Sequence, residues 1–495
     1  MLEFTPHDIL QHIALLTTTP VATPPSDLYA LLATCRTLYR ALNVSSNPHL
    51  YAAIFRHQYG PDLRNRTDSS LSAELHQRCD ALGRCRRIDL GVHRLRQDMS
   101  TLFWMVLEHG SQCDALSQVG FSSFVVQLAR NLLSDRKGDK NNIQLVVWLL
   151  CLALSRNDIL SQIPEEVRDE LVISLRPFVS TDASLYLTSL SPFSATDSQD
   201  KLCWLPPCST PRSRPQAVND EAGLLFYNKR VFLDLPPVSD AAVILIFALK
   251  EAVPLQAPYH LPATRALAIS ESRGGPTAED YTTFQSTLTP LFSDIRQTEM
   301  LTQSRLATTR AWVVNTLPEP EAADQRALIG AGSIAGVWEG AMMISSCGLS
   351  EDSEPPDFLC RTPMQCEFVE QQHESPPDWD HRETQSGNCP NILMRPDVEA
   401  CIALVGQTLP QHEEAWGSDG FTFAGRAHKN GEIVFTRRPK QPANQTSEAW
   451  LFIGRLCYGN ALVGTFRSSA VDDACSVCGI FSLRKQTPSP NAAPE

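Results

Sequence analysis

The chain has 495 residues, a length sufficient for about three domains with hydrophobic cores of their own. Apolar residues make up 43% of it, an ordinary fraction for a globular protein that argues against global disorder. The formal net charge of −13 argues against nucleic acid or an anionic membrane as the main partner, because both need a basic binding face.

The first residues carry the acids Glu3 and Asp8 and lack the basic and apolar pattern of a signal peptide. The longest apolar runs, 143–154 and 241–249, are too short to span a bilayer and suggest buried elements. Fifteen cysteines, an odd number without a small disulfide framework, indicate reduced thiols. We therefore expect an intracellular protein, in the cytoplasm or the nucleus.

The first module, residues 1–62, carries three helix start signals. They are Thr5 as a cap before Pro6, Ser26 before Asp27, and Asn47 before Pro48. Apolar residues recur at helical spacing after each signal, so the sequence predicts three helices within 5–59.

Three short helices form a small core, and Leu10, Leu32 and Tyr39 fall off its main apolar stripes. Surplus apolar surface on a small helical module is typical of a partner-binding surface. The alternative is that these residues pack against the rest of the chain, and periodicity alone leaves both open.

The order of residues in this module resembles an F-box. Residues 5–16 read Thr-Pro-His-Asp-Ile-Leu-Gln-His-Ile-Ala-Leu-Leu, and 27–39 read Asp-Leu-Tyr-Ala-Leu-Leu-Ala-Thr-Cys-Arg-Thr-Leu-Tyr. The usual opening Leu-Pro is replaced by Phe4-Thr5-Pro6, and the loop 17–25 is longer than the common pattern. The resemblance implies docking to a Skp-type adaptor and, through it, to a cullin-based ubiquitin ligase. The partner-facing residues that it implies are Phe4, Pro6, Ile9, Leu10, Ile13, Leu28, Leu31, Cys35, Leu38 and Tyr39.

Residues 63–190 show repeated helical stripes, with a central buried helix predicted at 143–154, where apolar residues lie all round. An arginine cluster at 84–96 is expected to be a solvated or salt-bridged turn. A Pro-, Ser- and Thr-rich linker follows at 191–222.

A mixed α/β region is predicted at 223–327, including a helix over 282–310. The β-rich C-terminal domain spans 328–486, with a loop insertion at 350–396 that contains one strand at 365–370, and a tail at 487–495. Asn430-Gly431 and Gly459-Asn460 are hairpin signals between aromatic strands. The sequence thus predicts an α+β multidomain fold that ends in an antiparallel meander closing, or nearly closing, into a barrel.

The whole layout is similar to a group of large fungal F-box proteins. The features that carry this likeness are the helical region with its Trp-Leu-Leu helix at 148–150, the Pro-rich break, and the sheet domain opened by Gly336-Val-Trp-Glu-Gly340. The likeness implies a substrate receptor and does not name the target protein.

The sequence contains only weak matches to motifs for metal binding, cofactor binding or catalysis. Cys475 and Cys478 have the spacing of half a zinc site, and no second pair at ligand spacing occurs among the other cysteines and histidines, so two reduced thiols are expected. Residues 330–335 match a dinucleotide fingerprint, but a strand follows where a phosphate-binding helix should start. We expect no cofactor, no metal and no catalytic centre of its own.

Two further features of the sheet domain have alternative interpretations. Arg426 and Arg455 follow equivalent glycines, and either converge on an acidic feature of a partner or lie on a solvated face, which is favoured. The aromatic residues Trp338, Phe423, Trp450 and Phe452 suit a barrel core or a ligand pocket, and a core is favoured.

The leading hypothesis is therefore a non-catalytic adaptor that binds a Skp-type protein and presents a target for ubiquitination. The second is a small-ligand-binding β-barrel with a vestigial F-box-like module. A third, a cryptic hydrolase, lacks a recognisable nucleophile and base.

Overall fold

The computed structural model divides the chain into two compact units. The first comprises Met1–Asp158 with Asp197–Leu235, and the second comprises Ile159–Thr196 with Pro236–Glu495. The structure describes residues 5–18, 26–60, 66–91, 94–109, 114–134, 140–179, 224–227, 229–231, 235–294, 332–345, 358–371, 402–416, 420–428, 431–440, 449–457, 459–468 and 477–486.

The first unit begins with four helices where the sequence predicted three. They are α1 (His7–Leu16), α2 (Ser26–Thr34), α3 (Arg36–Leu42) and α4 (Pro48–Tyr59). The expected second helix is divided at Cys35, whose extended backbone ends α2 and whose sulfur accepts a hydrogen bond from the Leu38 amide at 3.5 Å. Cys35 is thus the cap of a new helix.

The predicted N-cap position is confirmed at α4 and wrong at α1. Asn47 is the N-cap residue of α4, with Pro48 at the first position, but its side chain makes no capping hydrogen bond. In α1 the N-cap is Pro6 and no side chain caps the helix, so Thr5 does not have the predicted role.

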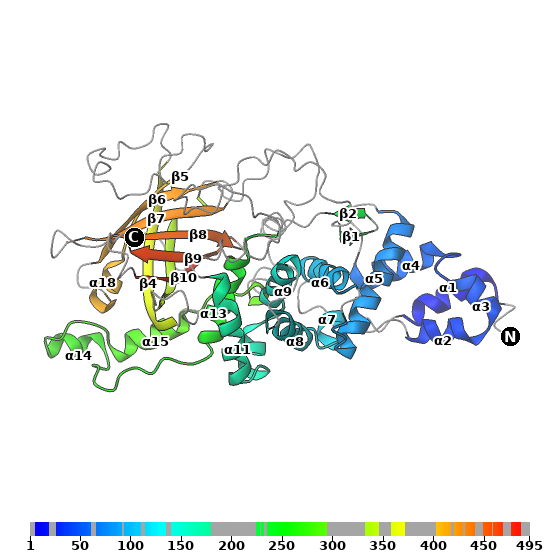
Figure 1. Cartoon of the computed structure of the whole chain (residues 1–495), viewed down its shortest axis with the longest axis horizontal. Helices are drawn as coiled ribbons and strands as arrows, with labels where there is room; N and C mark the ends of the chain where they lie inside the picture. The colour runs from blue at the N-terminus through cyan, green and yellow to red at the C-terminus, as the bar shows by residue number, and fades with distance from the viewer. Residues whose placement is uncertain are drawn as a thin grey trace, which may run out of the picture. The chain divides into compact units, whose positions relative to one another are not determined.

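Five further helices and a hairpin follow in the first unit (Figure 1). They are α5 (Asp68–Arg87), α6 (Leu95–His109), α7 (Asp114–Gln118), α8 (Phe121–Ser134) and α9 (Lys140–Ala153), with the hairpin of β1 (Leu224–Phe226) and β2 (Lys229–Val231). The predicted central helix is confirmed as α9, because every residue from 145 to 154 is buried. A short helix, α10 (Arg156–Ser161), follows α9 in the chain.

A buried charge network joins these elements. The fully buried guanidinium of Arg78 on α5 donates to Glu74 Oε1 at 2.9 Å and pairs with Glu108 on α6. The same guanidinium donates from Nη2 to the hydroxyl of Tyr227 at 3.0 Å, next to the β1–β2 hairpin. The arginine cluster 84–96, predicted as a turn, lies mostly in the end of α5 and the start of α6, and its member Arg84 on α5 pairs with Asp98 on α6.

The second unit contains a closed eight-stranded antiparallel barrel, which confirms the predicted meander. Each strand pairs with the next, and the last pairs with the first. The strands are β3 (Gly336–Ser345), β4 (Phe358–Gln371), β5 (Ile402–Gln407), β6 (Phe421–Ala427), β7 (Glu432–Pro439), β8 (Trp450–Cys457), β9 (Ala461–Ser468) and β10 (Cys478–Lys485).

Strand β4 lies inside the segment that the sequence assigned mainly to loop. The predicted strand at 365–370 is present, but it extends over 14 residues because β4 pairs along the whole of β3. Residues 350–357 and 372–396 of the predicted insertion lie outside the described residues. The hairpin signals agree with the backbone, since Gly431 and Gly459 both have positive φ, at 89° and 76°.

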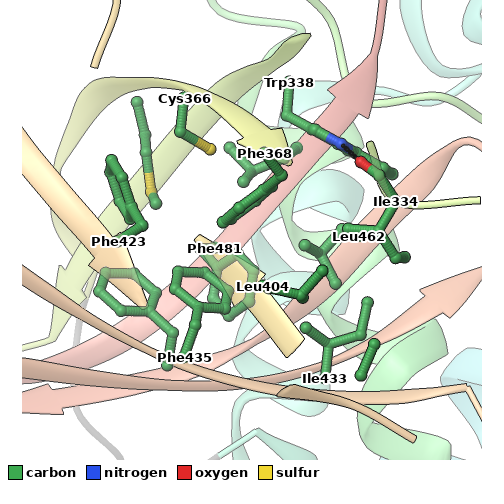
Figure 2. Packing of buried hydrophobic residues seen from close by; sticks show 14 of the residues in the cluster. Ile334, Trp338, Cys366, Phe368, Leu404, Phe423, Ile433, Phe435, Leu462 and Phe481 are labelled. Carbon is green, nitrogen blue, oxygen red and sulfur yellow. Dashed lines mark hydrogen bonds between the residues drawn. The ribbon is translucent and has the colours of Figure 1, made fainter. Parts of the chain in front are cut away.

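The barrel interior is filled mainly by aromatic rings. Phe435 on β7 stacks on Phe452 of β8 with ring centroids 4.9 Å apart, and Phe481 meets both rings edge-on. Figure 2 shows Phe435, Phe481 and Phe368 converging inside the barrel. At one end Trp338 donates its indole N–H to the Ile334 carbonyl at 2.7 Å, so its buried polar group is satisfied.

Glycines on the sheet allow neighbouring strands to approach closely. A Cβ at Gly425 would lie 2.1 Å from the carbonyl oxygen of Val434, and one at Gly454 would lie 2.7 Å from that of Val463. These are the glycines that end the two aromatic strand motifs in the sequence, and a side chain at either position would displace the adjacent strand.

The second unit also contains helices, of which α13 lies beside β8–β10 (Figure 1). They are α11 (Glu165–Leu175), the 3₁₀ turn η2 (Arg176–Phe178), α13 (Val238–Lys250), α14 (Arg265–Ser270), α15 (Ala278–Ser286) and α18 (Pro410–Trp416). The apolar run 241–249 is the buried part of α13, which packs against β8, β9 and β10 on one side and against α11 on another. Its all-round hydrophobicity follows from this double packing.

The predicted helix over 282–310 is only partly present. Helix α15 starts at Ala278, where Thr277 and Asp280 form a capping box, and it ends at Ser286. Residues 295–310 lie outside the described residues. None of the helices in the described part of the chain has the length and apolarity needed to cross a membrane.

Candidate functional site

The residues implied by the F-box resemblance divide into exposed and buried groups. Ile9 is 48% exposed and Tyr39 is 57% exposed, and Pro6 is exposed as well. The buried group is Leu10, Leu28 and Leu38, the half-buried group is Ile13, Leu31 and Cys35, and Phe4 lies outside the described residues. The buried group forms part of the module's own core, so it is unavailable to a partner in this conformation.

The exposed face of α1 is rotated by one residue from the face that holds the core. Leu10 and Ala14 point into the module, whereas Ile9, Ile13 and Leu16 follow one another at positions i, i+4 and i+7 of the adjacent stripe. Leu16 is 54% exposed and was not among the predicted partner-facing residues, although its helical spacing from Ile9 indicates that the two lie on the same face of α1.

Helices α2 and α3 add exposed aromatic rings to this module, which packs α1 against α3 and α4. Tyr29 on α2 is 50% exposed. We call Ile9, Leu16, Tyr29 and Tyr39 the N-terminal apolar set. Each of three short helices therefore has at least one apolar or aromatic side chain about half exposed to solvent. A hydrophobic partner surface would cover such side chains.

A second candidate site lies inside the barrel and was not predicted. Side chains on β7 alternate between faces, and Ile433 and Phe435 belong to the barrel core, so Arg437 points inward as well. Its Nη1 donates to the sulfur of Met342, on β3 across the barrel, at 3.4 Å. A charged residue on the inner face breaks the expected alternation and carries a cost unless it has a partner.

The guanidinium of Arg437 is surrounded by aromatic rings at one end of the barrel. Its central carbon lies 3.4 Å from the centroid of Phe421 on β6 and 5.3 Å from that of Trp450 on β8. Trp450 in turn stacks on Phe466 of β9, with centroids 5.4 Å apart. Cation–π contacts of this kind replace some of the hydration that burial removes.

No carboxylate pairs with Arg437 among the residues that the structure describes, and its Nε has no hydrogen-bond partner. Burial lowers the pKa of Arg437 to about 10, and only the Cys366 thiol acts against this shift. That thiol has a raised pKa because it is fully buried, so it stays protonated and supplies no negative charge at neutral pH. The guanidinium is therefore charged and has no counter-ion within the described ranges.

Other buried or half-buried arginines differ from Arg437 in this respect. Arg78 and Arg84 pair with glutamate and aspartate side chains, and Arg455 has its Nε 3.2 Å from Asp240 on α13. We expected Arg455 on a solvated face. Instead α13 packs over it, and the ion pair with Asp240 offsets part of the cost of removing its charge from water. Arg426 is half-buried on β6.

Helix α18 connects β5 to β6 at the Arg437 end of the barrel. Its His412 is partly buried, and burial, together with the charge of Arg437, lowers the pKa of that histidine to about 4. The helix is held by an ion pair between Glu413 and Lys440 and by Trp416, which packs on Tyr281 of α15 at 5.1 Å. His412 is consequently neutral near Arg437 at physiological pH.

The favoured core interpretation of the sheet aromatics is confirmed for Trp338, Phe423 and Phe452, which are buried in the barrel cluster. Trp450 is only partly buried and packs at the edge of that cluster. It is therefore the aromatic residue of the four that a ligand at the Arg437 end would meet.

The weak chemical motifs have simple structural settings. Cys478 begins β10, Cys475 lies outside the described residues, and within the described ranges no three His, Cys, Asp or Glu side chains are grouped to hold a metal. At the dinucleotide-like segment, the amides of Ile334 and Ala335 donate to Glu370 Oε1 at 2.6 and 3.0 Å. The chain's own carboxylate thus occupies these amides, and β3 follows directly.

Comparisons with protein-family models, with curated proteins and with solved structures found no match to this chain.

Proposed function

We propose that this protein is a substrate-recognition adaptor of a cullin-based, SCF-type ubiquitin ligase. Its N-terminal module binds a Skp-type adaptor, and its C-terminal region binds a target protein. The F-box-like order of residues in 5–39 motivates the proposal, and the observation that supports it is the N-terminal apolar set. Ile9, Leu16, Tyr29 and Tyr39 are each about half exposed although the module has a buried core of its own.

The mechanism is positioning, without bond chemistry by this chain. Holding a target next to the ligase converts a bimolecular encounter between a target lysine and the charged conjugating enzyme into an effectively intramolecular one. The rate gain depends on how rigidly the receptor links its two binding surfaces.

The test is binding of a purified Skp-type adaptor to the full chain and to an Ile9→Ser/Tyr39→Ser variant. About half of each side chain is exposed and available for burial. At about 1.5–3 kcal/mol for burying a whole side chain, the pair contributes roughly 2 kcal/mol, or about 30-fold in Kd. We expect the wild-type chain to bind and the variant to bind at least that much more weakly.

Ile173→Ser provides a matched control, because Ile173 on α11 is 52% exposed and lies in the other unit. It should bind the adaptor like the wild type. Circular dichroism should show unchanged helix content in both variants, since neither replaces a core residue. Wild-type affinity for the Ile9→Ser/Tyr39→Ser variant would contradict the proposal.

A further inference from the structure

The edge and the face of the Arg437 guanidinium differ in how their bonding capacity is used. The face stacks on Phe421, with the central carbon 3.4 Å from the ring centroid. Along the edge, Nε has no hydrogen-bond partner among the described residues, and Nη1 donates to the sulfur of Met342, a weak acceptor. Because stacking uses the face and hydrogen bonds use the plane, an acceptor can bind the edge without disturbing the stack.

We propose that this end of the barrel binds a small organic monocarboxylate, whose carboxylate pairs with the edge of Arg437 and whose apolar body packs on the surrounding rings. The proposal goes beyond the adaptor function and does not depend on it.

A carboxylate fits this position better than other anions. Its two oxygens match the parallel N–H groups of a guanidinium, which gives a bidentate, charge-assisted pair. Arg437 supplies a single positive charge, and the neighbouring His412 is held neutral by burial and by the arginine itself. The single charge of Arg437 matches that of a carboxylate, whereas a doubly charged phosphate would exceed it.

The surroundings limit the size and polarity of the ligand's body. Partly buried apolar side chains border this end of the barrel; they are Ile344, Phe421, Trp450 and Val477. Deeper in the barrel the stacked rings of Phe435 and Phe452 fill the interior, in keeping with the narrow bore of an eight-stranded barrel. A compact aromatic or branched acid would therefore suit this position better than a long acyl chain, which would have to extend into the filled interior.

The experiment is a titration of the purified full chain with phenylacetate and with its neutral isostere phenylacetamide, followed by calorimetry and ligand-observed NMR up to millimolar concentrations. We expect phenylacetate to bind and phenylacetamide to bind roughly tenfold or more weakly, because the amide loses the charge-assisted pair. Hexadecanoate should gain nothing over phenylacetate. This comparison needs no substitution, so it does not depend on a variant's folding.

Arg437→Met and Arg438→Gln form a matched pair, because Arg438 is the next residue on β7 and lies exposed on the outer face. Arg437→Met should bind phenylacetate roughly tenfold or more weakly than the wild type, and Arg438→Gln should bind it with wild-type affinity. Without ligand, Arg437→Met should melt at the same temperature as the wild type or higher, since it removes an uncompensated buried charge.

Three outcomes would overturn the proposal. They are the absence of phenylacetate binding to the wild type, equal binding of the acid and the amide, and a lower melting temperature of Arg437→Met with unchanged ligand binding. The last would make Arg437 a structural element of the barrel.

Discussion

The ion pair between Asp240 and Arg455 offers a test of what holds α13 on the barrel. Asp240 lies in the first turn of α13 and is only 7% exposed. Burial raises the pKa of Asp240 from its ordinary value of 3.8 to about 6, although the nearby Arg455 acts in the opposite direction. The attraction of the arginine thus only partly offsets the cost of burying the charge.

The sign of the pH dependence follows from this raised pKa. The folded state holds the proton of Asp240 more tightly than the unfolded state, so the group destabilises the fold as pH rises from 3.8 through about 6. The full cost is about 3 kcal/mol near pH 7 and falls to about half of that near pH 5. Asp240→Asn resembles the protonated acid and removes the cost, so the variant should be more stable by about these amounts.

Urea unfolding followed by tryptophan fluorescence measures this difference, because Trp338 is buried in the barrel that α13 covers. The stability gain of Asp240→Asn should be larger at neutral than at acidic pH. Asp169→Asn on α11 is the control, since the carboxylate of Asp169 is 60% exposed and its loss should change stability little at either pH. A variant that is less stable than the wild type at neutral pH would refute the reasoning and show that the ion pair outweighs desolvation.

Two further predictions concern other buried charges. Arg78→Met should destabilise the first unit by about 3–5 kcal/mol, because it leaves the buried Glu74 without its cation and removes from Glu108 one of its arginine partners, another being Arg66. Adding Glu74→Gln should restore part of the loss in urea unfolding. An Arg78→Met variant with full wild-type stability would contradict this prediction. His412, with its pKa lowered to about 4 from an ordinary 6.5 by burial and by Arg437, stays neutral in the fold while the unfolded chain takes up a proton. Stability should therefore fall by up to about 3 kcal/mol as pH drops from 6.5 to 4, and His412→Gln should lack that fall in unfolding curves across this range.

Much of the barrel could be predicted from local patterns. Alternating aromatic strands around Phe423 and Phe452, separated by turns with Gly431 and Gly459, already define hairpins, because each pattern is satisfied by neighbouring residues. The central helix α9 was equally readable, since a continuous apolar run of that length requires burial on every side.

Errors arose where a local signal had two solutions. Residues 26–42 have helical spacing throughout, yet the chain breaks at Cys35 to turn α3 onto α1 and α4. On α1 the sequence offered Ile9 and Leu10 together, and only packing decided that Leu10 is buried and Ile9 is exposed. The partner-facing set changes accordingly.

By itself the sequence determined the element types, the helical first part and the barrel-forming strands, because helix and strand periodicities are properties of adjacent residues. The tertiary structure alone decided which charges meet. Arg455 finds Asp240 from a distant helix, and Arg437 is enclosed by rings from other strands. The physical reason is that burial, and with it the cost of a charge, depends on neighbours far apart in the chain, which no local pattern records.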